Sequence, residues 1–453
     1  MAKIITRCFQ GGGAFLNAYR FLAKSALTAF ALIAATFTAN AVDTTIDAKA
    51  GATATTEQKN LLQTGADGGT VTVQGSGDKG LTVNFDANTK FTTHIVFDGG
   101  VHTVNSNNNG NPKSGVAEGY IVCDNSSNSN PMWLVKNGTT LNFTAKDFGG
   151  WNSASLADTC VIAVENGGII NLINQSGKTF YNRNRWLLNP DATMNLNSES
   201  DKFNIIGGTE SGKEQLYVPA GSGTATIGRS GNTGSLRIAS ESTAGAAAFV
   251  GEGATLAVNV PFISKDANSP FVKRGAGTMV FSSDVNSMKG DFTVEAGTVR
   301  ITSNSKNSLL GNVTITNGTI ETTQNYTIAN GSTARMTVGE GGTFIPKDLI
   351  VGDNSGKATL TVENGGVVRV GTATGKSWLK FYSTAEGNAT VNLKSGGVIE
   401  ACVITHETST AQSVINFDGG ILKAYAGTDF SRDLLDDEYI VVNVLSSGAI
   451  FEY

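Results

Sequence analysis

Residues 273–301 read KRGAGTMVFSSDVNSMKGDFTVEAGTVRI, and short apolar runs in this stretch stand between glycines. Within FTVEAGTVRI, apolar residues alternate with polar ones on both sides of the Ala-Gly corner, at Phe292 and Val294 and again at Val299 and Ile301. An alternation of period two is typical of a strand that buries one face. The stretch therefore predicts a strand, a corner and a second strand, with the apolar side chains on one side.

The same unit recurs along the chain. It is found at residues 94–104, 134–143, 163–172, 292–301, 313–322, 335–345, 360–370, 390–401 and 414–424. Its last six corners are marked by Gly297, Gly318, Gly342, Gly366, Gly397 and Gly420. These glycines follow one another at steps of 21, 24, 24, 31 and 23 residues. Since roughly 20–25 residues make one turn of a three-strand solenoid, the period indicates stacked turns.

We therefore predict an all-β fold, a right-handed parallel β-helix in which three strands make each turn. It would span residues 65–428, with insertion loops at about 105–190. Roughly 15 turns of ~4.8 Å each would give a rod about 70 Å long. The corners must turn sharply, which calls for residues with φ > 0. A series of β-hairpins would also use Asn-Gly corners, so a β-sandwich or meander with antiparallel strands is the alternative.

Both ends of the repeat region depart from its pattern. Residues 42–64 are predicted to cap the first turn, because Thr55 and Gln58 have the spacing of a capping box at the start of a short helix. Leu61 and Leu62 would form the apolar face of this helix. Residues 429–453 break the glycine rhythm, and we predict either a C-terminal cap or the start of a further region.

The first 41 residues have the pattern of a secretory signal peptide. Basic residues precede an apolar stretch at 25–38, and Ala39 and Ala41 then supply the small–x–small cleavage pattern. The alternative is a membrane anchor, for which the apolar stretch is short. We expect export by the Sec route, cleavage after Ala41, and a mature chain without a transmembrane segment.

The composition narrows the classes of function. Glycine accounts for 55 of 453 residues, charged residues make up only 16%, and the net charge is -5. This balance gives no electrostatic basis for binding nucleic acid or an anionic membrane. We expect a monomer that uses no cofactor.

Residues 275–301 resemble the autotransporter-associated β-strand repeat of bacterial surface and secreted proteins. The matching elements are Gly275-x-Gly277-Thr278, Asn286, Gly290 and the closing VEAGTVRI, with Met279 and Phe281 where the family usually has leucine. The resemblance implies an autotransporter passenger, secreted or held at the surface of a Gram-negative-type bacterium, with a role in adhesion, display or surface structure. Such passengers are commonly followed by a membrane β-barrel, and this chain contains no recognisable counterpart of one.

The loop-rich region holds the candidate ligand-binding residues, which are Trp133, Trp151, Tyr181, Arg183, Arg185 and Trp186. Aromatic faces stack on sugars and arginine offers planar donors, so these residues could contact a cell-surface glycan or protein. The alternative is that the aromatic side chains pack the loops against the rod. In the same region, Cys123 and Cys160 are the candidate pair for a disulfide in an exported chain.

The sequence indicates no catalytic or metal site. His94 and His102 lack companion acids at metal-like spacing and are predicted to lie on a strand surface. The chain contains neither G-x-S-x-G nor H-E-x-x-H. We predict a non-catalytic protein. The alternative is a carbohydrate-active β-helix enzyme, a polysaccharide lyase or glycosidase, which would need paired carboxylates. Asp436 and Asp437 form the only Asp-Asp pair in the sequence.

Overall fold

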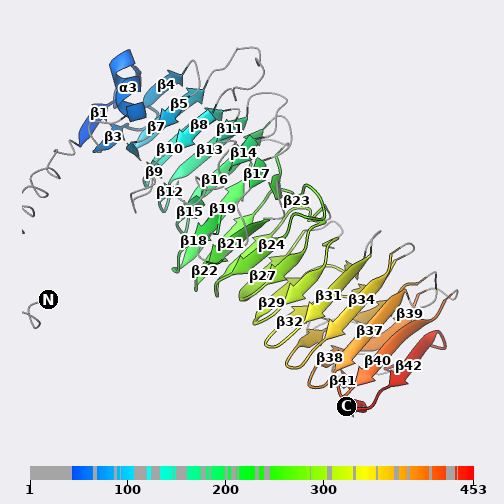
Figure 1. Ribbon diagram of the computed structural model, residues 1–453. Coiled ribbons are helices and arrows are strands. Elements are labelled where there is room, and N and C mark those ends of the chain that lie inside the picture. Colours follow the sequence, from blue (N-terminus) through cyan, green and yellow to red (C-terminus); the bar gives the residue numbers. More distant parts are fainter. Residues whose placement is uncertain are drawn as a thin grey trace, which may run out of the picture.

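The protein forms a β-solenoid whose layers stack along one long axis (Figure 1). The computed structural model describes residues 43–452 except for a set of gaps. The gaps are residues 65–68, 86–88, 92, 107–119, 124–132, 146, 149–160, 175–179, 183–184, 199–202, 206–210, 212–213, 230–233, 239–244, 286, 304–308, 330–332, 354–355, 372–376, 384, 386–387, 408–410, 425–433 and 436. The signal-peptide prediction and the cleavage site at Ala39 and Ala41 lie outside the described residues.

Two long sheets of sixteen strands each run the whole length of the solenoid. Sheet A consists of β1 (Thr44–Asp47), β3 (Thr70–Gln74), β6 (His94–Asp98), β9 (Trp133–Val135), β12 (Val161–Val164), β15 (Arg185–Leu188), β18 (Leu216–Val218), β21 (Ala246–Val250), β24 (Phe271–Arg274), β26 (Phe292–Val294), β28 (Val313–Ile315), β31 (Ala334–Val338), β34 (Ala358–Val362), β37 (Ala389–Lys394), β40 (Ser413–Asp418) and β42 (Ile440–Val444). Sheet B consists of β2 (Ala52–Thr53), β4 (Leu81–Phe85), β7 (Gly100–Ser106), β10 (Thr139–Ala145), β13 (Ile169–Asn174), β16 (Thr193–Ser198), β19 (Gly223–Gly228), β22 (Ala254–Val258), β25 (Thr278–Phe281), β27 (Gly297–Ile301), β29 (Gly318–Thr322), β32 (Thr343–Ile345), β35 (Val367–Arg369), β38 (Val398–Ala401), β41 (Ile421–Ala424) and β43 (Ile450–Glu452).

The third face of the solenoid is shorter and interrupted. Its seven-stranded part consists of β5 (Thr89–Phe91), β8 (Tyr120–Cys123), β11 (Asp147–Phe148), β14 (Phe180–Asn182), β17 (Phe203–Ile205), β20 (Leu236–Ile238) and β23 (Phe262–Ser264). Its four-stranded part consists of β30 (Tyr326–Ile328), β33 (Leu349–Val351), β36 (Trp378–Phe381) and β39 (Val403–His406). Among the described residues, eleven layers therefore carry a third strand.

Neighbouring strands pair in parallel and in register from layer to layer. In sheet A, for example, β31 pairs with β34 and β34 with β37, so that Val338, Val362 and Leu393 follow one another in one inward column. All three side chains are fully buried. The column shows why layers must stack, because each one covers the apolar side chains of the next. The parallel β-helix prediction is confirmed, and the antiparallel sandwich or meander is excluded.

The corners need glycine for two reasons: a left-handed backbone turn and close packing between layers. At the corner before β32, Gly341 has a φ of 66° and makes the left-handed turn. The predicted marker, Gly342, instead lies so close to the preceding layer that a Cβ would be 2.3 Å from the carbonyl oxygen of Ile315. Gly297 differs, since it has a positive φ of 68° itself. The glycine at position 342 is therefore explained by close packing between layers rather than by its own φ.

A short helix lies at the N-terminal end of the solenoid, at the predicted position. Helix α3 (Thr56–Thr64) follows β2 and packs against β5, in the place where other layers have a third strand (Figure 1). The capping box is present, since the Thr55 backbone N–H donates to Gln58 Oε1 at 2.9 Å and the Gln58 N–H to Thr55 Oγ1 at 3.2 Å. Leu62 is 1% exposed and joins the core. No helix in the described part of the chain combines the length and apolar character needed to cross a bilayer.

The layered region is longer than the predicted span of 65–428. It begins at β1 and ends at β43, so residues 440–452 form a further layer of both long sheets. The first layer escaped prediction because β2 has only two residues and lacks the apolar alternation of the repeat.

Candidate functional site

Two of the predicted ligand-binding residues are core residues. Trp133 and Trp186 are both 0% exposed and lie on the inward side of sheet A. The Trp133 ring packs edge-to-face against Phe97 and Phe143, with centroids 5.7 and 5.3 Å apart. The binding role predicted for these two tryptophans is therefore wrong, because no ligand can reach their rings.

The other predicted binding residues are only partly described. Trp151 and Arg183 lie outside the described residues, and so does the side chain of Tyr181 in β14. The candidate disulfide also falls outside, because Cys160 is not among the described residues. Of the six, Arg185 alone has a described and partly exposed side chain, so the structure does not bring the predicted set together as a surface site.

Arg185 belongs to a cluster on the outward side of sheet A. Its guanidinium lies over the ring of Tyr217, 4.9 Å from the centroid, and the other neighbour of that ring is Phe249, stacked at 4.8 Å with an interplanar angle of 9°. These three residues come from the consecutive strands β15, β18 and β21. Because Arg185 and Phe249 are both packed on Tyr217, the cluster joins layers, and the Tyr217 ring is not open for a sugar.

A buried carboxylate completes this cluster. Glu214 is 2% exposed, and its carboxylate oxygens lie 3.8 Å from Arg185 Nη2 and 3.4 Å from Arg274 Nη1. Arg274 also contacts both carboxylate oxygens of Glu295, through Nε at 2.7 Å and Nη2 at 3.2 Å. The arrangement stabilises the buried charge by pairing it with two guanidiniums. Sequence reasoning missed it because Glu214 and Arg274 are 60 positions apart.

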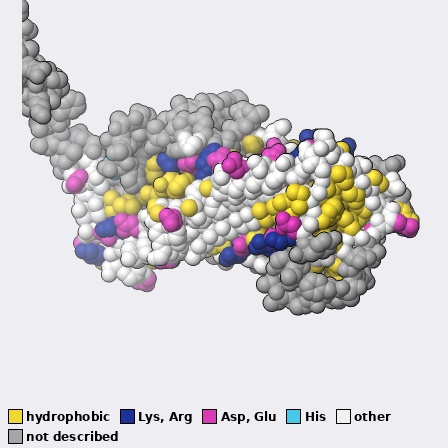
Figure 2. Space-filling view, turned by 90° about the horizontal axis from the view of Figure 1, so that it is seen from below, with side chains coloured by type: hydrophobic (Ala, Val, Ile, Leu, Met, Phe, Trp, Pro, Cys, Tyr) yellow, Lys and Arg dark blue, Asp and Glu magenta, His cyan; other side chains and the backbone are white. Residues whose placement is uncertain are grey.

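Three further ion pairs join adjacent layers in the same way. Lys136 pairs with Asp98 at 3.0 Å, Arg300 with Glu321 at 2.9 Å and Lys394 with Asp418 at 3.3 Å. Hydrogen bonds from Ser447 and Lys394 lower the pKa of the Asp418 carboxyl. In Figure 2, charged side chains stand in small clusters on a long face of mostly uncharged atoms. The carboxylates of Asp98, Glu321 and Asp418 are therefore already engaged by basic neighbours.

Uncharged polar side chains form ladders between the charged clusters. On the outward side of sheet B, strand register aligns Thr224, Thr255, Thr278, Thr298, Thr319 and Thr343 in one column across six layers. Asparagines form shorter ladders, in which Asn171 donates to Asn142 at 2.8 Å and Asn195 to Asn171 at 2.9 Å. In each of these contacts, an amide N–H of one layer donates a hydrogen bond to the neighbouring layer, so the ladders stabilise the stack.

Lys273 is a buried cation within the stretch that first indicated the repeat. Its side chain is 0% exposed, and Nζ donates to the carbonyl oxygens of Gly275 and Gly277, each at 2.6 Å, and of Ala296 at 2.8 Å. Burial lowers its pKa to about 8. The three carbonyls belong to corners of two adjacent layers, so Lys273 ties these corners together. An inward position occupied by lysine was the sequence signal for this role.

His102 also has a structural role, and the prediction that His94 and His102 lie on a strand surface is wrong. The two are 8% and 0% exposed, respectively. His102 Nδ1 accepts from the Leu81 N–H at 3.1 Å, and Nε2 lies 2.7 Å from the Gly99 carbonyl oxygen, to which it donates. This pair of contacts fixes the neutral imidazole. Burial is the main cause of its lowered pKa.

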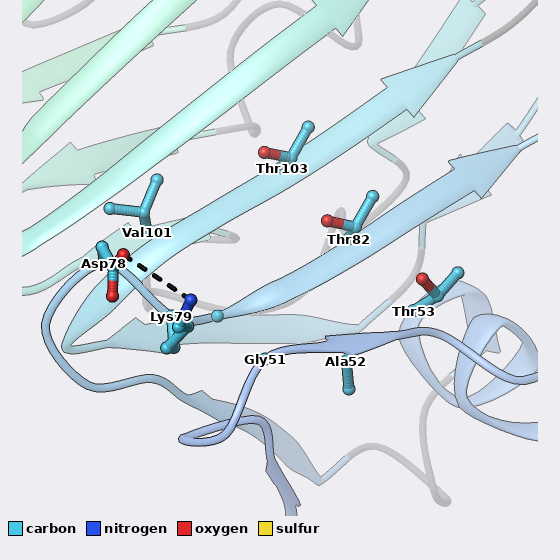
Figure 3. A pocket seen from close by; sticks show the side chains of 9 residues that line it. Gly51, Ala52, Thr53, Asp78, Lys79, Thr82, Val101 and Thr103 are labelled. Carbon is cyan, nitrogen blue, oxygen red and sulfur yellow. Dashed lines mark ion pairs between the residues drawn. The ribbon is translucent and has the colours of Figure 1, made fainter.

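A shallow hollow of about 380 Å³ lies on the outward side of sheet B, close to His102. Thr53, Thr82 and Thr103 line it from the consecutive strands β2, β4 and β7 (Figure 3). Beside them, Lys79 pairs with Asp78 at 3.6 Å, and both side chains are exposed. Hydroxyls and an exposed ion pair can hydrogen-bond a polar molecule, but they place no general base beside a nucleophile.

No group of three or more histidine, cysteine, aspartate or glutamate side chains suited to a metal ion occurs within the described ranges. Comparison with models of protein families, with curated proteins and with solved structures found no match for this chain. The β-solenoid is therefore established by the structure, and the resemblance to autotransporter repeats stays a prediction from residues 275–301.

Proposed function

We propose that the chain is an exported, non-catalytic β-solenoid of the autotransporter-passenger type, secreted or held at the cell surface, where it serves adhesion, display or surface structure. One observation carries the proposal: the outward polar groups of sheets A and B contact the neighbouring layers. Threonine columns, asparagine ladders and ion pairs such as Lys136–Asp98 all run along the rod. A surface organised in this way favours a rigid scaffold over a reaction centre.

Export rests on the leader at residues 1–41. Fusing these residues to a reporter that is active only after export should give an active reporter, with a mature N-terminus at Val42. The matched variant Ala39→Arg should leave the leader uncleaved, because signal peptidase needs small residues in this pattern. An inactive reporter, or cleavage unchanged by Ala39→Arg, would contradict the proposed export.

A carbohydrate-active enzyme is the second candidate, and the Glu214 cluster is the observation that favours it. Glu214 and Glu295 approach Arg274 from different layers on one outward face. Two acids and an arginine are the residue types that hydrolysis or elimination of a polysaccharide requires. In this chain, however, the guanidinium of Arg274 contacts both carboxylates, so each acid already has a basic partner.

A polysaccharide-cleavage screen of residues 42–453, run beside a glycan array, separates the two candidates. We expect no product release from any polymer. Sustained product release would overturn the non-catalytic proposal, and its loss in the Glu214→Gln variant would place the reaction at this cluster. The exposed variant Lys289→Ala is the matched control, since it lies on the same rod away from Glu214.

A further inference from the structure

Several corners of the solenoid contain an asparagine followed directly by a glycine. In the described part of the chain these pairs are Asn137-Gly138, Asn166-Gly167, Asn317-Gly318 and Asn364-Gly365. In flexible peptides an Asn-Gly pair loses ammonia through a cyclic imide, because glycine has no Cβ to keep its backbone nitrogen away from the carboxamide. The surroundings of each corner therefore decide whether the folded chain allows the same reaction.

The corner at Asn317 is the most protected of the four. Asn317 itself makes the left-handed turn, with a φ of 53°, so Gly318 is already part of β29 and is buried. Strand register pairs Gly318 with Gly297, and a Cβ on Gly318 would be 2.7 Å from Cγ1 of Val294. This close packing opposes the rotation that would bring the glycine nitrogen to the carboxamide.

Two further corners are exposed, but their glycine N–H groups are hydrogen-bonded to the next layer. Gly167 donates to the carbonyl oxygen of Asp191 at 3.2 Å, and Gly365 donates to that of Gly396 at 3.1 Å. The Asn166 carboxamide also donates to Asp191 Oδ2 at 3.4 Å. An N–H that is engaged in this way is harder to deprotonate, so its nitrogen is a poor nucleophile.

The corner at Asn137 has the least of these protections. Asn137 and Gly138 are both exposed, and a Cβ on Gly138 would meet nothing within 4 Å beyond its chain neighbours. The Gly138 N–H lies 3.4 Å from the Gly167 carbonyl oxygen, longer than the equivalent contacts of the other two exposed corners. Within the described residues the Asn137 carboxamide makes no hydrogen bond, although the backbone N–H of this residue donates to Glu165 Oε2 at 3.2 Å. The carboxamide is therefore free to turn toward the glycine nitrogen.

We propose that Asn137 is a site of spontaneous deamidation and the first of the four asparagines to react. The Gly138 nitrogen attacks Cγ of Asn137, and the carboxamide C–N bond breaks as ammonia leaves with the proton from the glycine nitrogen. Water then opens the cyclic imide at either carbonyl, which gives aspartate or isoaspartate. The only co-reactant is water, and no electrons are exchanged. The reaction does not depend on the proposed function.

The modification would change this corner in two ways. It replaces a neutral amide with a carboxylate beside Glu165, so two like charges would face each other across adjacent layers. Isoaspartate also lengthens the main chain by one carbon just before Thr139, whose Oγ1 accepts from the Gly99 N–H at 2.7 Å. Both changes should weaken the contact of this layer with its neighbours.

Peptide mapping by mass spectrometry tests the order of reaction. The purified chain is kept folded in mildly alkaline buffer, and conversion of each Asn-Gly pair is followed with time. We expect Asn137 to convert at least about tenfold faster than Asn317, since a buried strand exchanges and reacts only when it opens. Asn166 and Asn364 should convert at intermediate rates. In the denatured chain all four pairs should convert at similar rates, because the protection then is lost.

Matched variants identify the reacting group. In Asn137→Gln the peptide that carries residue 137 should stay unmodified, because the longer side chain would have to close a larger ring. Asn166→Gln is the control, and conversion at Asn137 should continue in it. Both positions are exposed, so neither substitution threatens the fold.

Two results would overturn the proposal. One is conversion of Asn166, Asn317 or Asn364 in the folded chain at a rate equal to or above that of Asn137. The other is an unmodified Asn137 after a time in which the denatured chain has converted completely.

Discussion

The inward apolar side chains of sheet A are buried at the N-terminal end of the solenoid and exposed at the C-terminal end. At the N-terminal end, Ile46 in β1 is 3% exposed and Leu62 of α3 is 1% exposed, and both belong to the buried core. At the C-terminal end, Val442 and Val444 occupy equivalent inward positions and are 40% and 59% exposed. The difference teaches that an inward side chain is buried only where its layer has a neighbouring layer or helix on both sides.

In the middle of the rod, layers are covered on both sides, so substitutions there should cause the largest loss of unfolding free energy. Lys273→Ala should lower the free energy of unfolding by about 3 kcal/mol or more, because it leaves a cavity and removes the donor from three buried carbonyls. Denaturant unfolding measures the loss. Lys289→Ala, exposed in the same stretch, should change stability by less than about 0.5 kcal/mol. Equal effects of the two substitutions would mean that Lys273 does not hold the corners together.

A direct comparison of the two ends uses one substitution at each. Leu62→Ala should cost about 2–4 kcal/mol, since it empties a buried site under α3. Val442→Ala should cost less than about 1 kcal/mol, since its side chain is already partly in water. Hydrogen exchange should report the first loss in β1 and β3 and the second in β40. A larger effect at Val442 would show that the C-terminal layer is covered in solution.

Acid should weaken the N-terminal end of the solenoid selectively through His102. Its folded-state pKa lies below the ordinary value of 6.5, so the unfolded chain binds the proton more readily. Stability contributed by the neutral ring is complete above pH 6.5 and falls as the pH decreases below that value, by at most about 1.4 kcal/mol per pH unit. Exchange at the Leu81 amide should accelerate between pH 7 and 5, and His102→Gln should remove this dependence. Faster exchange at higher pH, after correction for intrinsic rates, would contradict the sign.

The smallest effect is expected at the start of α3. Thr55→Ala removes one half of the capping box and should cost about 0.5–1 kcal/mol. Thr55→Ser keeps the hydroxyl and serves as the control. Hydrogen exchange within α3 is the suitable readout, because fraying of the helix start need not unfold the layers. If Thr55→Ala and Thr55→Ser behave alike, the helix start is held by Leu61 and Leu62 instead.

The fold could be predicted because its signals are local. The period-two alternation and the glycine corners lie within ten or so residues of each other, and they determine which side chains face the interior. The same alternation, applied to Trp133-x-Val135, would have placed that tryptophan in the core, and the polar loops around it misled the prediction. The contacts of Lys273 with Ala296 and of Glu214 with Arg274 could not be predicted, since these partners lie 23 and 60 positions away in the sequence.

The direction of the hydrogen bonds has a mechanical consequence. In sheets A and B, each strand is bonded to the strands of the layers before and after it, so the backbone hydrogen bonds run along the rod. Tension applied between the two ends would therefore act on all the interfaces in series, and the weakest interface would separate first. The force the rod withstands would be set by its weakest interface and would not increase with length, whereas its reach would increase with every added layer.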